Sequence, residues 1–108
     1  MDISKIHFQN ARIIRVIENT DQRRLTFEVS YPLDEHDSDF RRAKLIFECY
    51  SRYLVSERDL NGEPTISQAE IIEENPRGVT IRIKTDYGLR EVGCLEVGEE
   101  RAERKDLT

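Results

Sequence analysis

The 108-residue chain lacks the short motifs that mark the common catalytic and nucleotide-binding sites. It contains no Gly-x-Ser-x-Gly, no Gly-x-Gly-x-x-Gly and no Gly-x-x-x-x-Gly-Lys, so neither a nucleophile elbow nor a phosphate-binding loop is indicated. The two histidines, His7 and His36, lie in no recognisable motif. The pairs Glu73/Glu74 and Glu99/Glu100 are adjacent in sequence, and adjacent side chains of a strand point to opposite faces. We therefore expect a protein that is not an enzyme and that needs no cofactor.

Long apolar segments are also missing. No window approaches the ~20 apolar residues of a transmembrane helix, and the start Met-Asp-Ile-Ser-Lys-Ile-His lacks the basic residues and apolar stretch of a signal peptide. The only cysteines, Cys49 and Cys94, are far apart in sequence and belong to no Cys-x-x-Cys pair. This spacing favours two free, largely buried thiols and a cytoplasmic protein.

Basic residues are too few for a nucleic-acid-binding surface. The chain has 17 Lys and Arg against 22 Asp and Glu, which gives a net charge of −5. Because phosphate backbones attract a surplus of basic side chains, we expect no nucleic-acid partner, and we expect no membrane partner. An acidic surface suits a basic protein partner, and it is also an ordinary means of staying soluble.

Alternating apolar and polar residues dominate what the chain does contain. The segments "RRLTFEVSY" and "GVTIRIKTD" alternate with a period of two, as antiparallel strands with one buried face do. "RAKLIFECYSRYLVSE" is longer than a typical strand, so we expect it to bend or break near Ser51. The side chains predicted to form the core are Leu25, Phe27, Val29, Tyr31, Leu45, Phe47, Cys49, Val79, Ile81 and Ile83.

Further strands are predicted by "ARIIRVIEN", "TISQAEIIEEN" and "LREVGCLEV", and a short N-terminal one by Ile3, Ile6 and Phe8. Turn signals such as "NPRG" and "DYG" separate them, without a helical period between the turns. The prediction is an all-β antiparallel sandwich of about seven or eight strands, with a partly open β-barrel as the alternative. The single domain would span residues 1–97, followed by a charged tail over residues 98–108.

The segment "YPLDEHDSDFRR" holds the densest group of potential metal ligands. If consecutive strands are antiparallel, this loop lies at the same end of the sandwich as Glu74. Calcium takes six to eight oxygen ligands in flexible geometry, so Asp34, Asp37, Asp39 and Glu74 are the candidate ligands. The loop lacks the ordered spacing of a calcium loop, and His36 would be an unusual ligand for a hard cation. A solvated loop without metal is therefore the interpretation that we prefer.

Tyr50 and Arg52 are the candidate binding residues of "CYSRYLVSER". They share a face of the predicted strand, and Tyr and Arg are favoured in protein interfaces. Stacking of nucleic-acid bases on Tyr50 is less consistent with Glu48, which lies on the same face. The alternative is an outer sheet face that carries one amphipathic tyrosine.

Over Arg23 to Val97, the segments "RRLTFEVSYP", "FRRAKLIFECYSRYLVSE" and "GEPTISQAEIIEENPRGVTIRIKTDYGLREVGCLEV" resemble small bacterial all-β proteins of unknown function. Some of these are regarded as immunity proteins against toxins. The resemblance rests on strand patterning and on the "DYG" turn, and it implies a compact β-sandwich with a protein partner.

We therefore expect a non-enzymatic protein-interaction module, such as an immunity-type inhibitor of a basic partner. A sandwich that binds calcium or a small ligand through residues 34–39 is the alternative. Exposed edge strands would also allow a homodimer.

Overall fold

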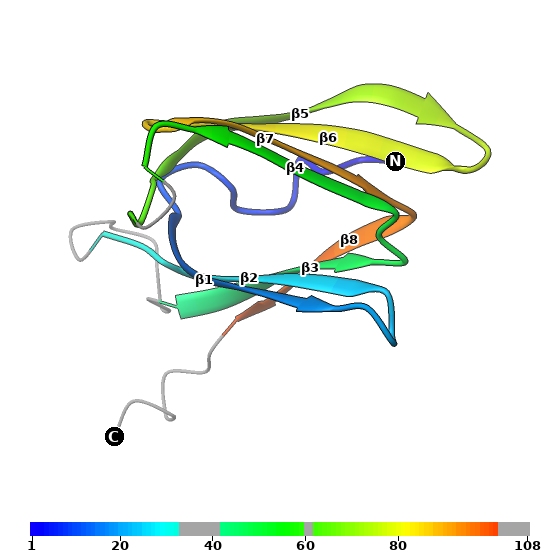
Figure 1. Ribbon diagram of the computed structural model, residues 1–108, viewed down its shortest axis with the longest axis horizontal. Coiled ribbons are helices and arrows are strands. Elements are labelled where there is room, and N and C mark those ends of the chain that lie inside the picture. Colours follow the sequence, from blue (N-terminus) through cyan, green and yellow to red (C-terminus); the bar gives the residue numbers. More distant parts are fainter. Residues whose placement is uncertain (33–41, 60–61, 102–108) are drawn as a thin grey trace.

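The described part of the chain is built entirely from β-strands and their connections. The computed structural model describes residues 1–32, 42–59 and 62–101. The strands form two antiparallel sheets of four, which do not close into a barrel within these residues (Figure 1). In spatial order, the first sheet contains β1 (Arg12–Asn19), β2 (Arg24–Ser30), β3 (Arg42–Glu48) and β8 (Glu96–Arg101). The second sheet contains, in spatial order, β4 (Arg52–Glu57), β7 (Gly88–Cys94), β6 (Gly78–Thr85) and β5 (Ile66–Asn75). The predicted antiparallel β-sandwich is confirmed.

The core fills the space between the two sheets. In β2, β3 and β6 every second side chain is buried, as the period-two pattern predicted. Phe27 and Phe47 are completely buried and meet edge to face, with ring centres 5.1 Å apart. Nine of the ten predicted core residues are buried, and the exception is Cys49, which is only half-buried.

Cys49 is less buried than predicted because it lies at a corner where the chain changes sheets. β3 ends at Glu48, and β4 begins at Arg52 in the other sheet, so the predicted break near Ser51 is confirmed. Cys49 adopts a φ of 53°, an uncommon backbone conformation that turns the chain here. The Tyr50 amide then donates to the Arg23 carbonyl at 3.0 Å, and the Ser51 amide donates to the Gly93 carbonyl at 2.8 Å.

A second corner divides the segment "LREVGCLEV", which we had predicted to be one strand. β7 ends at Cys94 in the second sheet, and β8 begins at Glu96 in the first. The Leu95 amide donates to the Glu48 carbonyl at 3.0 Å, which ties this corner to the end of β3. The one-strand prediction was wrong because alternation continues across the corner and hides the change of sheet.

The first corner also reverses the predicted arrangement of the loops. Because the chain changes sheets and reverses direction between β3 and β4, it turns once more than the predicted arrangement assumed, and the loops after β4 lie at the opposite end. Pro32 and Arg42 lie at the end that also contains the β6–β7 turn, whereas Glu74 lies near the β5–β6 turn at the other end (Figure 1). The prediction that Glu74 lies at the same end as the acidic loop was wrong.

The N-terminal residues cover one side of the sandwich. Ile3 and Ile6 pack against the core and Phe8 is buried, but they lie in turns and irregular backbone, so the short strand predicted here was wrong. The His7 amide donates to Glu99 Oε2 at 3.2 Å, and the Met1 ammonium pairs with Glu74. β8 pairs with β3 as far as Arg101, so regular structure continues beyond Val97, where we expected the tail to begin. The described residues include no helix that could span a membrane.

Candidate protein-binding edge

The two sheets have four edge strands, and three of them carry features that discourage pairing with another chain. β1 has a bulge between Ile13 and Arg15, and β5 has two irregularities in its register. The N-terminal residues also lie beside β5. In β8, four of the six residues are charged. β4 differs, because its register with β7 is regular over its whole length. An unpaired, regular edge strand is a template for another strand.

The middle of β4 is uncharged and exposes apolar side chains. Tyr53, Leu54, Val55 and Ser56 form an uncharged run between Arg52 and Glu57. Leu54 is 50% exposed and Val55 is 38% exposed. Leu54 lies on the outer face of the sheet, where Leu89 of β7 is its diagonal neighbour and is also exposed. β4 therefore combines an available edge with exposed apolar side chains.

The hydrogen bonds to β7 show which backbone groups of β4 remain available. The Arg58 amide donates to the Tyr87 carbonyl of the neighbouring strand connection at 3.0 Å, so the backbone of Arg58 faces β7. Backbone groups alternate along a strand, and those of Leu54 and Ser56 must also face β7. The N–H and C=O groups of Tyr53 and Val55 consequently point away from the sheet. No described strand pairs with them.

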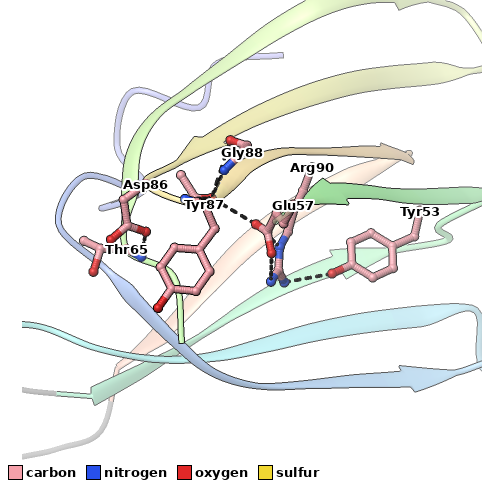
Figure 2. A network of polar contacts seen from close by, with 8 residues as sticks. Tyr53, Glu57, Thr65, Asp86, Tyr87, Gly88 and Arg90 are labelled. Carbon is pink, nitrogen blue, oxygen red and sulfur yellow. Dashed lines mark hydrogen bonds and ion pairs between the residues drawn. The ribbon is translucent and has the colours of Figure 1, made fainter. Parts of the chain in front are cut away.

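A buried ion pair anchors β4 on its inner face. Arg90 of β7 donates to both carboxylate oxygens of Glu57, at 2.8 and 2.7 Å, and a third bond of 2.9 Å joins it to the Tyr53 hydroxyl (Figure 2). The Glu57 side chain is 0% exposed and that of Arg90 is 9% exposed. The Arg90 guanidinium also lies 5.6 Å from the centre of the Phe27 ring, a cation–π contact that reaches the first sheet.

The network continues into the turn between β6 and β7. The Thr85 hydroxyl donates to Glu57 Oε2 at 2.9 Å and accepts hydrogen bonds from the amides of Tyr87 and Gly88, both at 3.1 Å. Gly88 has a φ of 149° and approaches β4 so closely that a Cβ atom would lie 2.1 Å from the Ser56 carbonyl oxygen. Any larger residue at Gly88 would displace β4, so the "DYG" turn fixes the position of the edge strand.

Arg90 and Tyr53 keep their protonation states at physiological pH. Burial alone would lower the pKa of Arg90, but its hydrogen bonds and the negative charge of Glu57 outweigh that effect and raise the pKa. Burial raises the pKa of Tyr53 despite the positive charge of Arg90 beside it. Arg90 is therefore always a cation and Tyr53 a neutral phenol, and β4 keeps the same anchors.

The two predicted binding residues lie at the start of this edge but contact different sheets. Tyr50 precedes β4 and donates its hydroxyl to Glu18 of β1 at 3.1 Å, and burial followed by this bond raises its pKa. Arg52 is exposed on the outer face of β4 and lies 3.7 Å from Glu91. Tyr50 and Arg52 are thus close to Leu54 in the sequence, but their side chains do not form one cluster with each other.

Three of the four predicted calcium ligands, Asp34, Asp37 and Asp39, lie outside the described residues. Glu74, the fourth, pairs with the Met1 ammonium at the other end of the sandwich from Pro32 and Arg42. Within residues 1–32, 42–59 and 62–101, no group of three His, Cys, Asp or Glu residues is arranged to hold a metal ion.

Sequence reasoning missed Glu57 and Arg90, although the pattern contains a signal for them. Glu57 follows Tyr53 and Val55 on the inner face of β4, and Arg90 precedes Val92 and Cys94 on the inner face of β7. Opposite charges at inward positions of two strands predict a buried ion pair, once the strands are known to be neighbours.

Comparison with models of protein families found no match to this chain, and a search of curated proteins found no significant relative.

Proposed function

We propose that this protein is a non-enzymatic protein-interaction module that binds an extended segment of a partner along the edge of β4. The observation that supports this most directly is the regular, uncharged edge, with the outward backbone groups of Tyr53 and Val55 and the exposed Leu54 beside them. In strand addition, backbone hydrogen bonds supply affinity and alternate side chains supply specificity.

Rigidity of the edge supports the same function. In the described part of the chain β4 has one neighbouring strand, yet the ion pair of Glu57 and Arg90 and the close approach of Gly88 hold it in place. A binding strand that is already ordered loses little conformational entropy when a partner binds. The buried ion pair therefore does more than fill the core, since it holds the binding edge against β7.

The net charge of the whole chain favours a basic partner, whereas the charges around β4 favour neither a basic nor an acidic one. The net charge of −5 favours a basic partner through long-range attraction. Close to β4, Arg52 lies 3.7 Å from Glu91 and the Arg58 guanidinium lies over the Tyr87 ring, so the edge itself carries no acidic excess. An inhibitor of a basic protein would thus use its acidic surface to attract the partner, and β4 would bind without selecting for charge. The cytoplasm, which keeps thiols such as Cys49 and Cys94 reduced, is the compartment that we expect.

The test is capture of binding proteins from a lysate of the source organism by matched variants. Val55→Pro removes an outward-facing N–H and keeps the hydrogen bonds to β7, because proline is tolerated on edge strands. Leu54→Lys adds a charge to the same edge, and Ile17→Lys makes the same kind of change at an exposed apolar residue of the first sheet.

Each variant is first checked by circular dichroism and thermal unfolding. The proposal predicts a partner that wild type and Ile17→Lys retain and that both β4 variants lose. In hydrogen exchange, the amides of Tyr53 and Val55 should become protected when the partner binds. Equal retention by all four proteins would refute a role for β4.

A further inference from the structure

We infer that the segment which pairs with β4 is β4 of a second copy of this protein, so that the two second sheets join into one continuous sheet. This inference rests on the proposed function, because it assigns an occupant to the same edge. It follows from the registers that a two-fold symmetric β4–β4 pair can adopt.

Three symmetric registers pair the outward-facing backbone groups of Tyr53 and Val55 with one another across the two copies. In antiparallel pairing, residues whose backbone faces the partner lie opposite one another, so these registers are centred on Tyr53, Leu54 or Val55. A pair centred on Val55 would place Arg52 of each copy opposite Arg58 of the other. Like charges directly opposite each other are destabilising. A pair centred on Tyr53 would use Ser51, which belongs to the corner where the chain leaves the sheet.

The register centred on Leu54 has neither fault. Leu54 then lies opposite Leu54 of the second copy, in a position without backbone hydrogen bonds where side chains are closest. Tyr53 lies opposite Val55 of the second copy, an aromatic and β-branched pair that is favourable across strands. Arg52 lies opposite Ser56, so no like charges meet. This register also uses the whole uncharged run of β4.

The same register covers the exposed apolar residues at this edge. Leu54 is 50% exposed, Val55 is 38% exposed and Leu89 is 36% exposed in the single chain. Because Leu89 lies diagonal to Leu54 on the outer face, the two copies would bring four leucines together across the symmetry axis. The dimer would therefore give the outward-facing backbone groups of β4 hydrogen-bond partners and would bury the apolar side chains at the same edge.

Salt dependence distinguishes this dimer from binding to a basic partner. Each copy has a net charge of −5, so two copies repel each other at long range, and added salt screens that repulsion. The dimer should become tighter at high salt. Attraction to a basic partner should become weaker under the same change.

The decisive experiment is disulfide cross-linking of single cysteines in a Cys49→Ser background, with Cys94 left in the core. In the proposed register, Leu54→Cys brings two cysteines to a Cα separation of about 4.5 Å, which a disulfide can span. Ser56→Cys is the matched control, because its two copies would be displaced by four residues, about 13 Å along the strand. Light scattering of wild type, Val55→Pro and Leu54→Lys at low and high salt gives the oligomeric state independently.

The inference predicts a wild-type dimer that strengthens with salt, rapid cross-linking of Leu54→Cys only, and monomers for both β4 variants. A wild-type monomer whose captured partner is lost by Val55→Pro would overturn the dimer and leave the proposed function intact. A dimer that survives in both β4 variants, or that cross-links through Ser56→Cys, would show another interface or register and would also overturn the inference. A monomer whose partner binds Val55→Pro normally would refute both proposals.

Discussion

Replacing Arg90 by methionine tests whether the buried ion pair holds β4 in place. Arg90→Met leaves the Glu57 carboxylate, whose side chain is 0% exposed, with the Thr85 hydroxyl as its one side-chain partner among the residues that the structure describes. Removing one member of a buried ion pair lowers the free energy of unfolding by about 3–5 kcal/mol. A domain of this size loses about 4–8 °C in melting temperature per kcal/mol, so we expect a fall of at least about 12 °C.

The matched control is Arg52→Met, which removes an exposed guanidinium 3.7 Å from Glu91 on the same two strands. Exposed ion pairs contribute about 0–1 kcal/mol, so this variant should melt within a few degrees of wild type. The double variant Glu57→Leu/Arg90→Met should recover most of the loss, because a well-packed apolar pair can replace a buried ion pair. Thermal and urea unfolding followed by circular dichroism gives all three values. Equal losses for Arg90→Met and Arg52→Met would refute the anchoring role.

Three further predictions concern the thiols, the core and the acidic loop. Burial raises the pKa of Cys94 to about 11, so at pH 8 about one Cys94 thiol in a thousand is ionised. Cys49 is less buried and should therefore react first with a thiol reagent. Preferential labelling of Cys94 in the folded protein would contradict this prediction. Phe27→Asp places an unpaired charge at a fully buried site and should unfold the protein, and a soluble variant with a cooperative melt would contradict the assignment of β2. The calcium-binding alternative for residues 34–39 predicts heat on titration with calcium, and titration to millimolar ion without heat would exclude it.

The strands were predictable because local alternation determines which face of a strand is buried. Leu25, Phe27 and Val29 alternate with polar residues and all lie in the core, as the pattern indicated. The turns "NPRG" and "DYG" were likewise recognised, because the conformations they require favour particular residues. These features depend only on residues close together in the chain.

Sheet membership was not predictable from the same pattern. At Cys49 and again at Leu95 the chain passes from one sheet to the other without interrupting the alternation. The break near Ser51 was predicted but the change of sheet was not, and at Leu95 one predicted strand spanned the corner. The error at Cys49 then reversed the expected ends of the later loops.

The candidate site was predicted only in part. Tyr50 and Arg52 lie at the start of the edge, but the importance of Leu54 and Val55 depends on β4 having no second neighbour among the described strands. Which strands are edges is a property of the whole topology, and no local pattern encodes it. Glu57 and Arg90 could be recognised as a pair only once β4 and β7 were known to be neighbours.

The two corners also determine the order in which the sheets can assemble during synthesis. Strands β4 to β7 are contiguous in the chain and complete their sheet once Cys94 has left the ribosome. The first sheet must wait for β8, which pairs with β3 across about half the length of the chain. Until then the edge of β3 at Lys44 to Phe47 has no partner, and a nascent chain in this state exposes a strand prone to aggregation. Translation that stops just after Cys94 would thus release a complete second sheet joined to an unfinished first one.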